Sequence, residues 1–202
     1  MSKKKLKVGV LFGGRSAEHE VSLVSAFSVI KNLDYKKYEA VPIGITKKGE
    51  WYAGPQVLDL LKSGKSIPKL LQVILPAEPG RELLKNQNTK IKIQKLSLDV
   101  VFPVLHGTFG EDGTVQGLLE LSGIPYVGCG VLGSAVGMDK IAQKMIFQAV
   151  GIPTPNFLYI RLSEYKKNSQ KFIKECQTKL RLPCFVKPAN LGSSVGISKA
   201  HN

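Results

Sequence analysis

The sequence is short of acidic residues, cysteines and long apolar runs, and each shortage excludes something. Its 202 residues hold 29 lysines and arginines but only 15 aspartates and glutamates, a formal net charge of +14. The three cysteines form no C-x-x-C pair, which argues against a disulfide framework and a zinc site and for reduced thiols. No apolar run is long enough to span a membrane, and no secretory signal follows the basic N-terminus. We therefore expect a cytoplasmic protein that has no membrane partner.

The excess of positive charge leaves more than one explanation open. A basic domain that binds nucleic acid has such a composition. The lysines, however, are spread through the chain without an interleaved aromatic platform, and a nucleotide is itself an anionic ligand. We favour the nucleotide and expect no nucleic-acid partner. The alternative, a nucleic-acid-binding domain, predicts steeply salt-dependent binding to DNA. A third explanation is that an acidic part is missing from this chain.

The first 45 residues predict the start of a doubly wound α/β sheet. Residues 8–12 are nearly all apolar and end in two glycines, as buried parallel strands do. Ser16 is the expected N-cap of the helix that follows, and residues 38–45 read as the next strand. The apolar residues expected on the buried face of this helix are Leu23, Ala26, Phe27, Ile30 and Leu33.

The middle of the chain predicts small strands and a second core strand. Residues 50–52 suit a short strand, in which the lone Trp51 is expected to serve packing. Residues 90–96 alternate apolar and polar side chains, which favours an edge strand. Residues 99–105 read as a core strand, and residues 114–121 as a helix that a glycine ends.

The last third predicts an alternation of helices and strands. A helix over residues 138–150 begins with Asp139 as N-cap, and the glycine and prolines after it mark the best domain boundary in the chain. A strand over residues 156–160 and a helix from Ser163 to about Lys179 are expected next. Residues 182–197 then read as strand, loop, strand.

Two polar residues follow the two core strands. Glu18 lies just after the first strand, and His106 just after the strand over residues 99–105. Ligands of such sheets bind at the carboxyl ends of the strands, where a carboxylate could hold an ammonium group. The alternatives are that Glu18 only complements a helix dipole and that His106 is a structural histidine. The residues alone do not decide between these interpretations.

The loop near the end of the chain has the composition of a phosphate site. Lys187 ends a strand, and Gly192, Ser193 and Ser194 follow in a short polar loop. Consecutive N–H groups and hydroxyls of such a loop can converge on phosphate oxygens. No Walker pattern competes with it. A hairpin with a Gly-Ser turn and a solvated lysine is the structural alternative.

Other patterns are weaker. Lys140 and Lys144 share one helix face, which suits either a phosphate site or a solvated basic stripe. Residues 128–133 match G-x-G-x-x-G, but the acid expected about 20 residues later is absent, so we do not expect NAD or FAD. Glu111 and Asp112 are interpreted as acids of a turn and a helix start rather than as a metal site.

Four stretches resemble the D-alanine–D-alanine ligases of the ATP-grasp family, in the family's order. The resemblance implies an α/β fold: a Rossmann-like, parallel-sheet N-terminal domain over residues 1–137, which binds substrate. The first, α+β part of an ATP-grasp domain then follows over residues 138–202, where it is incomplete. The stretches are G-G-R-S-A-E-H-E-V-S-L, V-L-H-G-T-F-G-E-D-G-T-V-Q-G, M-D-K-I-A-Q-K and V-K-P-A-N-L-G-S-S-V-G-I.

The resemblance also implies roles for individual residues. Glu18 would hold the amino group of the first D-alanine, Val21 would pack near its methyl group, and His106 would lie near its carboxylate. The residue matching Ser193 hydrogen-bonds toward the residue matching Glu18 in the family, so these two are the expected catalytic residues. The expected ATP-binding residues are Lys140, Lys187, Gly192, Ser193 and Ser194.

The implied reaction joins two D-alanines, through a D-alanyl phosphate made with ATP and Mg²⁺, into D-alanyl-D-alanine for peptidoglycan. D-Lactate or D-serine as second substrate, or another ATP-grasp ligase, stays open. Family members are usually homodimers. The chain ends at Asn202, and the resemblance places the Mg²⁺ ligands beyond it. We therefore expect no metal site here, a chain inactive alone, and self-association through an unpaired strand edge.

Overall fold

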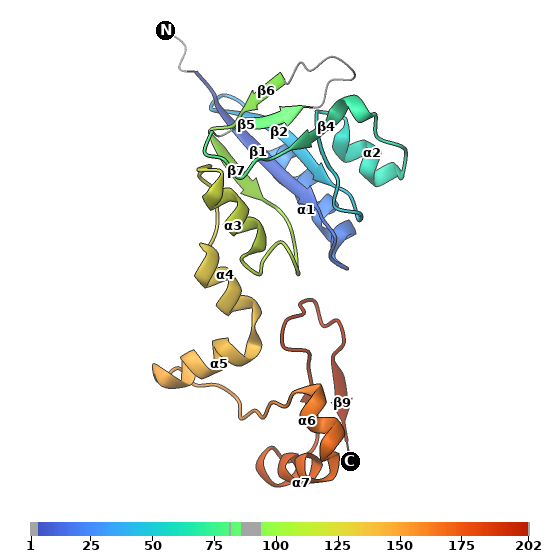
Figure 1. Ribbon diagram of the computed structural model, residues 1–202, viewed down its shortest axis with the longest axis vertical. Coiled ribbons are helices and arrows are strands. Elements are labelled where there is room, and N and C mark those ends of the chain that lie inside the picture. Colours follow the sequence, from blue (N-terminus) through green and yellow to red (C-terminus); the bar gives the residue numbers. More distant parts are fainter. Residues whose placement is uncertain (1–3, 81, 86–93, 202) are drawn as a thin grey trace. The chain divides into compact units, whose positions relative to one another are not determined.

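The computed structural model describes residues 4–80, 82–85 and 94–201. The chain divides into two compact units, Met1–Ala135 and Val136–Asn202, whose helices and strands are drawn in Figure 1. None of the helices in the described part of the chain is long and apolar enough to span a membrane.

The first unit is built on parallel strands. β1 (Leu6–Gly13) pairs with β2 (Tyr38–Ile45) on one side and with β7 (Val100–Pro103) on the other, both in parallel. α1 (His19–Asn32) connects β1 to β2, which confirms the predicted opening. Because parallel neighbours run in one direction, the loops that follow β1 and β7 leave the sheet at the same edge.

Antiparallel strands extend this sheet beyond β2. They are, in order, β3 (Trp51–Ala53), β4 (Gln72–Ile74), β5 (Glu82–Lys85) and β6 (Gln94–Ser97). α2 (Val57–Ser63) and the short 3₁₀ helix η1 (Lys69–Leu71) lie between β3 and β4. The α/β prediction is confirmed, but the sheet is mixed rather than parallel throughout. Residues 90–93 of the predicted edge strand lie outside the described residues.

Apolar residues that alternate along β1 divide the core into two layers. Val10 and Phe12 pack with Leu23 of α1 on one face of the sheet. Leu11 packs on the other face with Leu119 of α3 (Thr114–Leu121). All five side chains are almost completely buried, and each such burial contributes about 1.5–3 kcal/mol. The helices on the two faces therefore fix the direction of β1 and the position of its last residue.

The predicted buried face of α1 is wrong at Phe27, and it extends one residue too far, because Leu33 lies beyond the end of the helix. Leu23 and Ala26 are buried, but Phe27 is 48 % exposed. The ammonium group of Lys62 lies 4.2 Å from the centroid of the Phe27 ring. A cation over the face of an aromatic ring is attracted to the ring but leaves the ring at the surface. The helical spacing therefore predicted a wider buried face of α1 than the structure has.

The second unit is helical with a small hairpin. The end of α4 (Val131–Met138) leads into α5 (Lys140–Ala149), and Asp139 caps α5 as predicted by accepting hydrogen bonds from the N–H groups of Ile141 and Ala142, both at 2.9 Å. The remaining elements are α6 (Leu162–Lys167), α7 (Ser169–Lys179) and the antiparallel pair β8 (Cys184–Val186) and β9 (Ser198–Ala200).

Three secondary-structure predictions for this unit are wrong. Residues 156–160 form no strand, and in the described part of this unit no neighbouring strand pairs with them. The predicted long helix is divided at Asn168, whose side chain accepts a hydrogen bond from the N–H of Lys171 at 3.2 Å and so begins a new helix. The last strand begins at Ser198, beyond residue 197, where the predicted strand–loop–strand segment ended.

Candidate active site

A buried hydroxyl connects the carboxyl ends of β1 and β7. Ser22 of α1 accepts a hydrogen bond from the N–H of Gly13 at 2.8 Å and donates one to the carbonyl of Val104 at 2.5 Å. Ser22 is completely buried, so water does not compete for either bond. The two loops that follow these strands therefore start from a fixed spacing.

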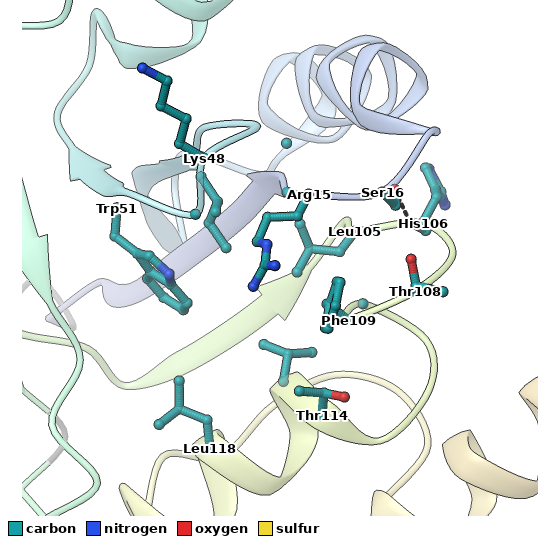
Figure 2. Close-up of a pocket in the computed structure, with 16 residues that line it drawn as sticks. Arg15, Ser16, Lys48, Trp51, Leu105, His106, Thr108, Phe109, Thr114 and Leu118 are labelled. Atoms are coloured by element: carbon teal, nitrogen blue, oxygen red, sulfur yellow. Dashed lines mark hydrogen bonds between the residues drawn. The ribbon is translucent and has the colours of Figure 1, made fainter.

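Ser16 makes a second connection between the same loops. Its hydroxyl donates to the carbonyl of His106 at 2.7 Å, the dashed line in Figure 2, and accepts from the N–H of Glu18 at 3.1 Å. The prediction that Ser16 caps α1 is wrong, because the helix begins at His19 and Ser16 stabilises the turn before it. This turn holds Glu18 beside the loop that carries His106.

The carboxylate of Glu18 lies against the backbone of Gly107. Gly107 has a φ of +71°, and a Cβ added there would overlap a carboxylate oxygen of Glu18. The N–H of Gly107 donates to Glu111 at 2.7 Å, which holds the loop from its other side. The structure thus brings Glu18 and His106, which lie far apart in the sequence, to one edge of the sheet.

The imidazole of His106 is held by Ser25, a residue that sequence reasoning did not single out. Nε2 of His106 lies 3.0 Å from the hydroxyl of Ser25 on α1. A hydroxyl that donates to Nε2 leaves the ring proton on Nδ1, which is then a hydrogen-bond donor. Glu18, Val21 and Ser25 follow one another at helical spacing, and this pattern was the signal available in the sequence. Val21 is 54 % exposed on the same helix.

Glu111 and Asp112 are turn acids, as predicted. Asp112 accepts hydrogen bonds from the N–H groups of Phe109 and Thr114, at 2.8 and 3.0 Å. Burial raises the pKa of the Asp112 carboxyl, but the hydrogen bonds from Thr114 and Phe109 outweigh it, so this pKa lies below its usual value. Within the described ranges, no group of three or more histidines, cysteines or acids is arranged to hold a metal ion.

Three lysines lie around the loop between β8 and β9 in the second unit. Lys140 donates its side-chain hydrogen bond to the carbonyl of Leu191, within the loop. Lys144 lies 4.9 Å from the ring centroid of Phe157. Burial lowers the pKa of Lys144, and the charge of Lys187 lowers it further. Two ammonium groups that repel each other form a favourable place for an anion.

The loop itself is held in an unusual backbone conformation. Its left-handed residues are Ser193 (φ +46°), Ser194 (φ +61°) and Gly196 (φ +70°). The side chain of Asn190 donates to Asp139 at 3.1 Å and so attaches the loop to the start of α5. Serine rarely adopts this conformation, so the loop is shaped by its hydrogen bonds more than by residue preference.

Comparison with known proteins agrees with both units. Residues 7–129 match the family model described as D-ala D-ala ligase N-terminus, and residues 146–202 match D-ala D-ala ligase C-terminus. A D-alanine–D-alanine ligase of Natranaerobius thermophilus is 51 % identical over 200 residues, which are 98 % of this chain and 54 % of that protein. One of Caldicellulosiruptor bescii is 50 % identical over 196 residues, 97 % of this chain and 53 % of that protein. The chain thus spans about half the length of these curated relatives.

Solved structures show the same likeness. The VanG D-Ala:D-Ser ligase of Enterococcus faecalis is 36 % identical with a TM-score of 0.79, over 98 % of this chain and 56 % of that one. The D-alanine–D-alanine ligase of Coxiella burnetii is 33 % identical with a TM-score of 0.80, over 98 % of this chain and 57 % of that one. With the family model matched over more than half of its residues, this chain belongs to the D-alanine–D-alanine ligase family.

Proposed function

We propose that this chain supplies the first substrate site and part of the ATP site of a ligase that joins two D-alanines. The observation that carries the proposal is the placement of the Glu18 carboxylate against Gly107, directly beside His106. A free amino acid is a zwitterion, so its site needs an acid for the ammonium group and a donor for the carboxylate. This edge of the sheet offers both groups.

The first D-alanine would contact three residues of the first unit. The Glu18 carboxylate would accept hydrogen bonds from the ammonium group, and the Nδ1–H of His106 would donate to the carboxylate. Val21, exposed on α1, would lie beside the methyl group. Residues 1–137 would accordingly form the substrate-binding domain.

ATP would bind to residues 138–202, the incomplete first part of an ATP-grasp domain. Lys187 and Lys140 would neutralise phosphate charge, and Gly192, Ser193 and Ser194 would offer N–H and hydroxyl donors. The mutual repulsion of Lys144 and Lys187 supports this assignment, since a polyphosphate relieves it.

ATP, as co-substrate, would supply the phosphoryl group that turns the carboxylate of the first D-alanine into an acyl phosphate. Mg²⁺ would neutralise charge on that group, held by residues other than those that the structure describes. By holding the ammonium group, Glu18 would orient the substrate, and Ser193 would align the loop that holds the phosphate. The amine of a second D-alanine then attacks the acyl carbon and phosphate leaves. The product, D-alanyl-D-alanine, would enter peptidoglycan synthesis. The reaction uses ATP and therefore belongs in the cytoplasm, and the protein would act as a homodimer.

Binding and turnover separate the parts of this proposal. Calorimetric titration of the chain should show D-alanine binding, no L-alanine binding, and a loss of at least about tenfold in affinity in Glu18→Gln, which removes a charge-assisted hydrogen bond. Exposed Glu39→Gln is the control. D-Alanine-dependent ADP release should be measured for this chain and for a version with the full length of the relatives. Equal binding of D- and L-alanine, or no D-alanine turnover in the longer version, would contradict the proposal.

A second candidate changes only the second substrate. It is favoured by the 36 % identity to a structure named as a D-Ala:D-Ser ligase. Turnover of the longer version with D-alanine plus D-serine or D-lactate, compared with D-alanine alone, decides between these products.

A further inference from the structure

A cavity lies beside the proposed D-alanine site, entirely within the first unit. It holds about 300 Å³ and is lined by three segments: residues 13–16, residues 45–51, and residues 105–118. Glu18, which would hold the substrate, is not among its lining residues. The cavity therefore adjoins the substrate site and shares His106 with it, but it does not reach Glu18.

The cavity has an apolar floor. Ile45 of β2, Leu105 of the loop after β7 and Val115 of α3 belong to the buried core. Half-buried Trp51 forms one wall. Trp51 thus packs on the core, as the sequence suggested, and also presents its indole to an open space, as Figure 2 shows. A floor and wall of this kind favour a flat apolar or aromatic body.

One cation reaches into this apolar space. Figure 2 shows the Arg15 side chain extending between Trp51 and Phe109, and its guanidinium carbon lies 4.7 Å from the centroid of the Phe109 ring. The stem of Arg15 passes so close to Gly49 that an added Cβ would lie 3.0 Å from its Cδ. Arg15 is therefore held in a defined position.

The charge of Arg15 has no acidic partner within the described part of the chain. The lining of the cavity includes no aspartate or glutamate, and no ion pair between described residues involves Arg15. Nearby Lys47, by contrast, pairs with Glu20 at 2.8 Å. Lys48 also lines the cavity, but Figure 2 shows its side chain extending away from Arg15.

We propose that this cavity is a binding site for a small carboxylate with an aromatic body. The ring of the ligand lies on the apolar floor of Ile45, Leu105 and Val115. Its carboxylate pairs with the guanidinium group of Arg15 in the fork geometry that suits the two groups. D-Alanine has no such body, so the site takes a second class of ligand, and its walls include Ser16 and His106 of the substrate site.

The single tryptophan makes the test direct, because Trp51 is the only one in the chain. Excited at 295 nm (about the red edge of indole absorption), its fluorescence is titrated with 3-phenylpropionate, which does not absorb there, and with the neutral isostere 3-phenylpropanamide. We expect a saturable change with the acid and an affinity at least about tenfold weaker for the amide, because only the acid pairs with Arg15.

Three variants locate the site. Arg15→Gln should weaken 3-phenylpropionate binding about tenfold. Lys48→Gln also removes one positive charge, at the cavity rim, and should change the affinity for 3-phenylpropionate less than about twofold. Glu18→Gln should leave it unchanged while it weakens D-alanine binding, which separates this proposal from the proposed function. A non-saturable fluorescence change, equal binding of acid and amide, or equal losses in Arg15→Gln and Lys48→Gln would overturn the proposal. Native circular dichroism of each variant excludes misfolding as the cause.

Discussion

The two units hold their functional side chains by different means. In the first unit, Ser22 lies inside a two-layered core and joins strand ends that are distant in the sequence. In the second unit, α5, α6 and α7 have no buried residues within the described chain. The loop is held by hydrogen bonds from Lys140 to Leu191 and from Asn190 to Asp139, which connect it to the start of α5. The comparison teaches that the substrate edge depends on the global core, whereas the phosphate loop depends on a few hydrogen bonds to the start of α5.

The largest expected effect is the difference in stability lost when a buried residue of the first unit and an exposed residue of the second unit are each replaced by alanine. Leu119→Ala removes a side chain with no exposed surface and should lower the free energy of unfolding of the first unit by about 2–5 kcal/mol. Ile146→Ala, at a residue of α5 that is 45 % exposed, should cost less than about 1 kcal/mol in the second unit. Urea unfolding checks this, with Trp51 fluorescence reporting on the first unit. Equal costs would remove the difference in burial on which the comparison rests.

Ser22→Ala should be next in size. The substitution leaves the N–H of Gly13 and the carbonyl of Val104 without their partner, and buried groups left unsatisfied cost about 1–3 kcal/mol each. We expect a loss of about 2–4 kcal/mol in the same urea experiment. Ser28→Ala, on the exposed side of α1, is the matched control and should change stability by less than about 0.5 kcal/mol. A Ser22→Ala protein as stable as the control would mean that the two strand ends keep their spacing without this hydroxyl.

Ser25→Ala tests positioning more than stability. Without the hydroxyl at Nε2, His106 should populate both tautomers, and D-alanine affinity should fall about three- to tenfold. The ¹⁵N chemical shifts of the His106 ring report the tautomer directly and do not depend on substrate. Ser25→Thr keeps the hydroxyl and should restore most of the affinity. An unchanged ring spectrum in Ser25→Ala would exclude this role.

The smallest effect concerns the start of α5. Asp139→Ala should cost about 1 kcal/mol, because two N–H groups lose their acceptor. The hydrogen bond from Ala142 is the main reason that the pKa of Asp139 lies below its usual value, with those from Asn190 and Ile141 adding to it against the effect of burial. A group whose pKa is lowered by folding stabilises the fold above its unfolded pKa, near 4, and this contribution is lost as the pH falls through the folded pKa.

Unfolding followed by far-UV circular dichroism between about pH 2 and 6 measures how the stability of the protein depends on pH. Asp139→Asn keeps a capping acceptor but cannot titrate, so its stability should lack this component. If both proteins lose the same stability on acidification, the carboxylate of Asp139 does not contribute to it.

Sequence patterns predicted what depends on neighbours in the chain. The strand–helix–strand opening, the helix over residues 114–121 and the Asp139 cap are set by local periodicity and side-chain chemistry, and all three are present. The strand expected over residues 156–160 is absent, because a strand needs a partner that local sequence does not specify.

The site shows the same division. Glu18 and His106 were proposed from their positions after core strands, but the contact of Ser25 with His106 depends on how α1 packs beside a distant loop. The cavity around Arg15 could likewise not be predicted from the sequence, since its three lining segments meet only after folding. Trp51 was assigned to packing from its sequence alone, and its open face appears only in the folded unit.

Gly107 shows what a residue without a side chain contributes. Its positive φ and the nearness of the Glu18 carboxylate leave no room for a Cβ. In a mutational scan, position 107 should thus tolerate as few substitutions as positions 18 and 106, although it has no reactive group. We therefore expect positions 18 and 107 to vary together: a homologue that lacks the acid at position 18 should also have lost the glycine at position 107.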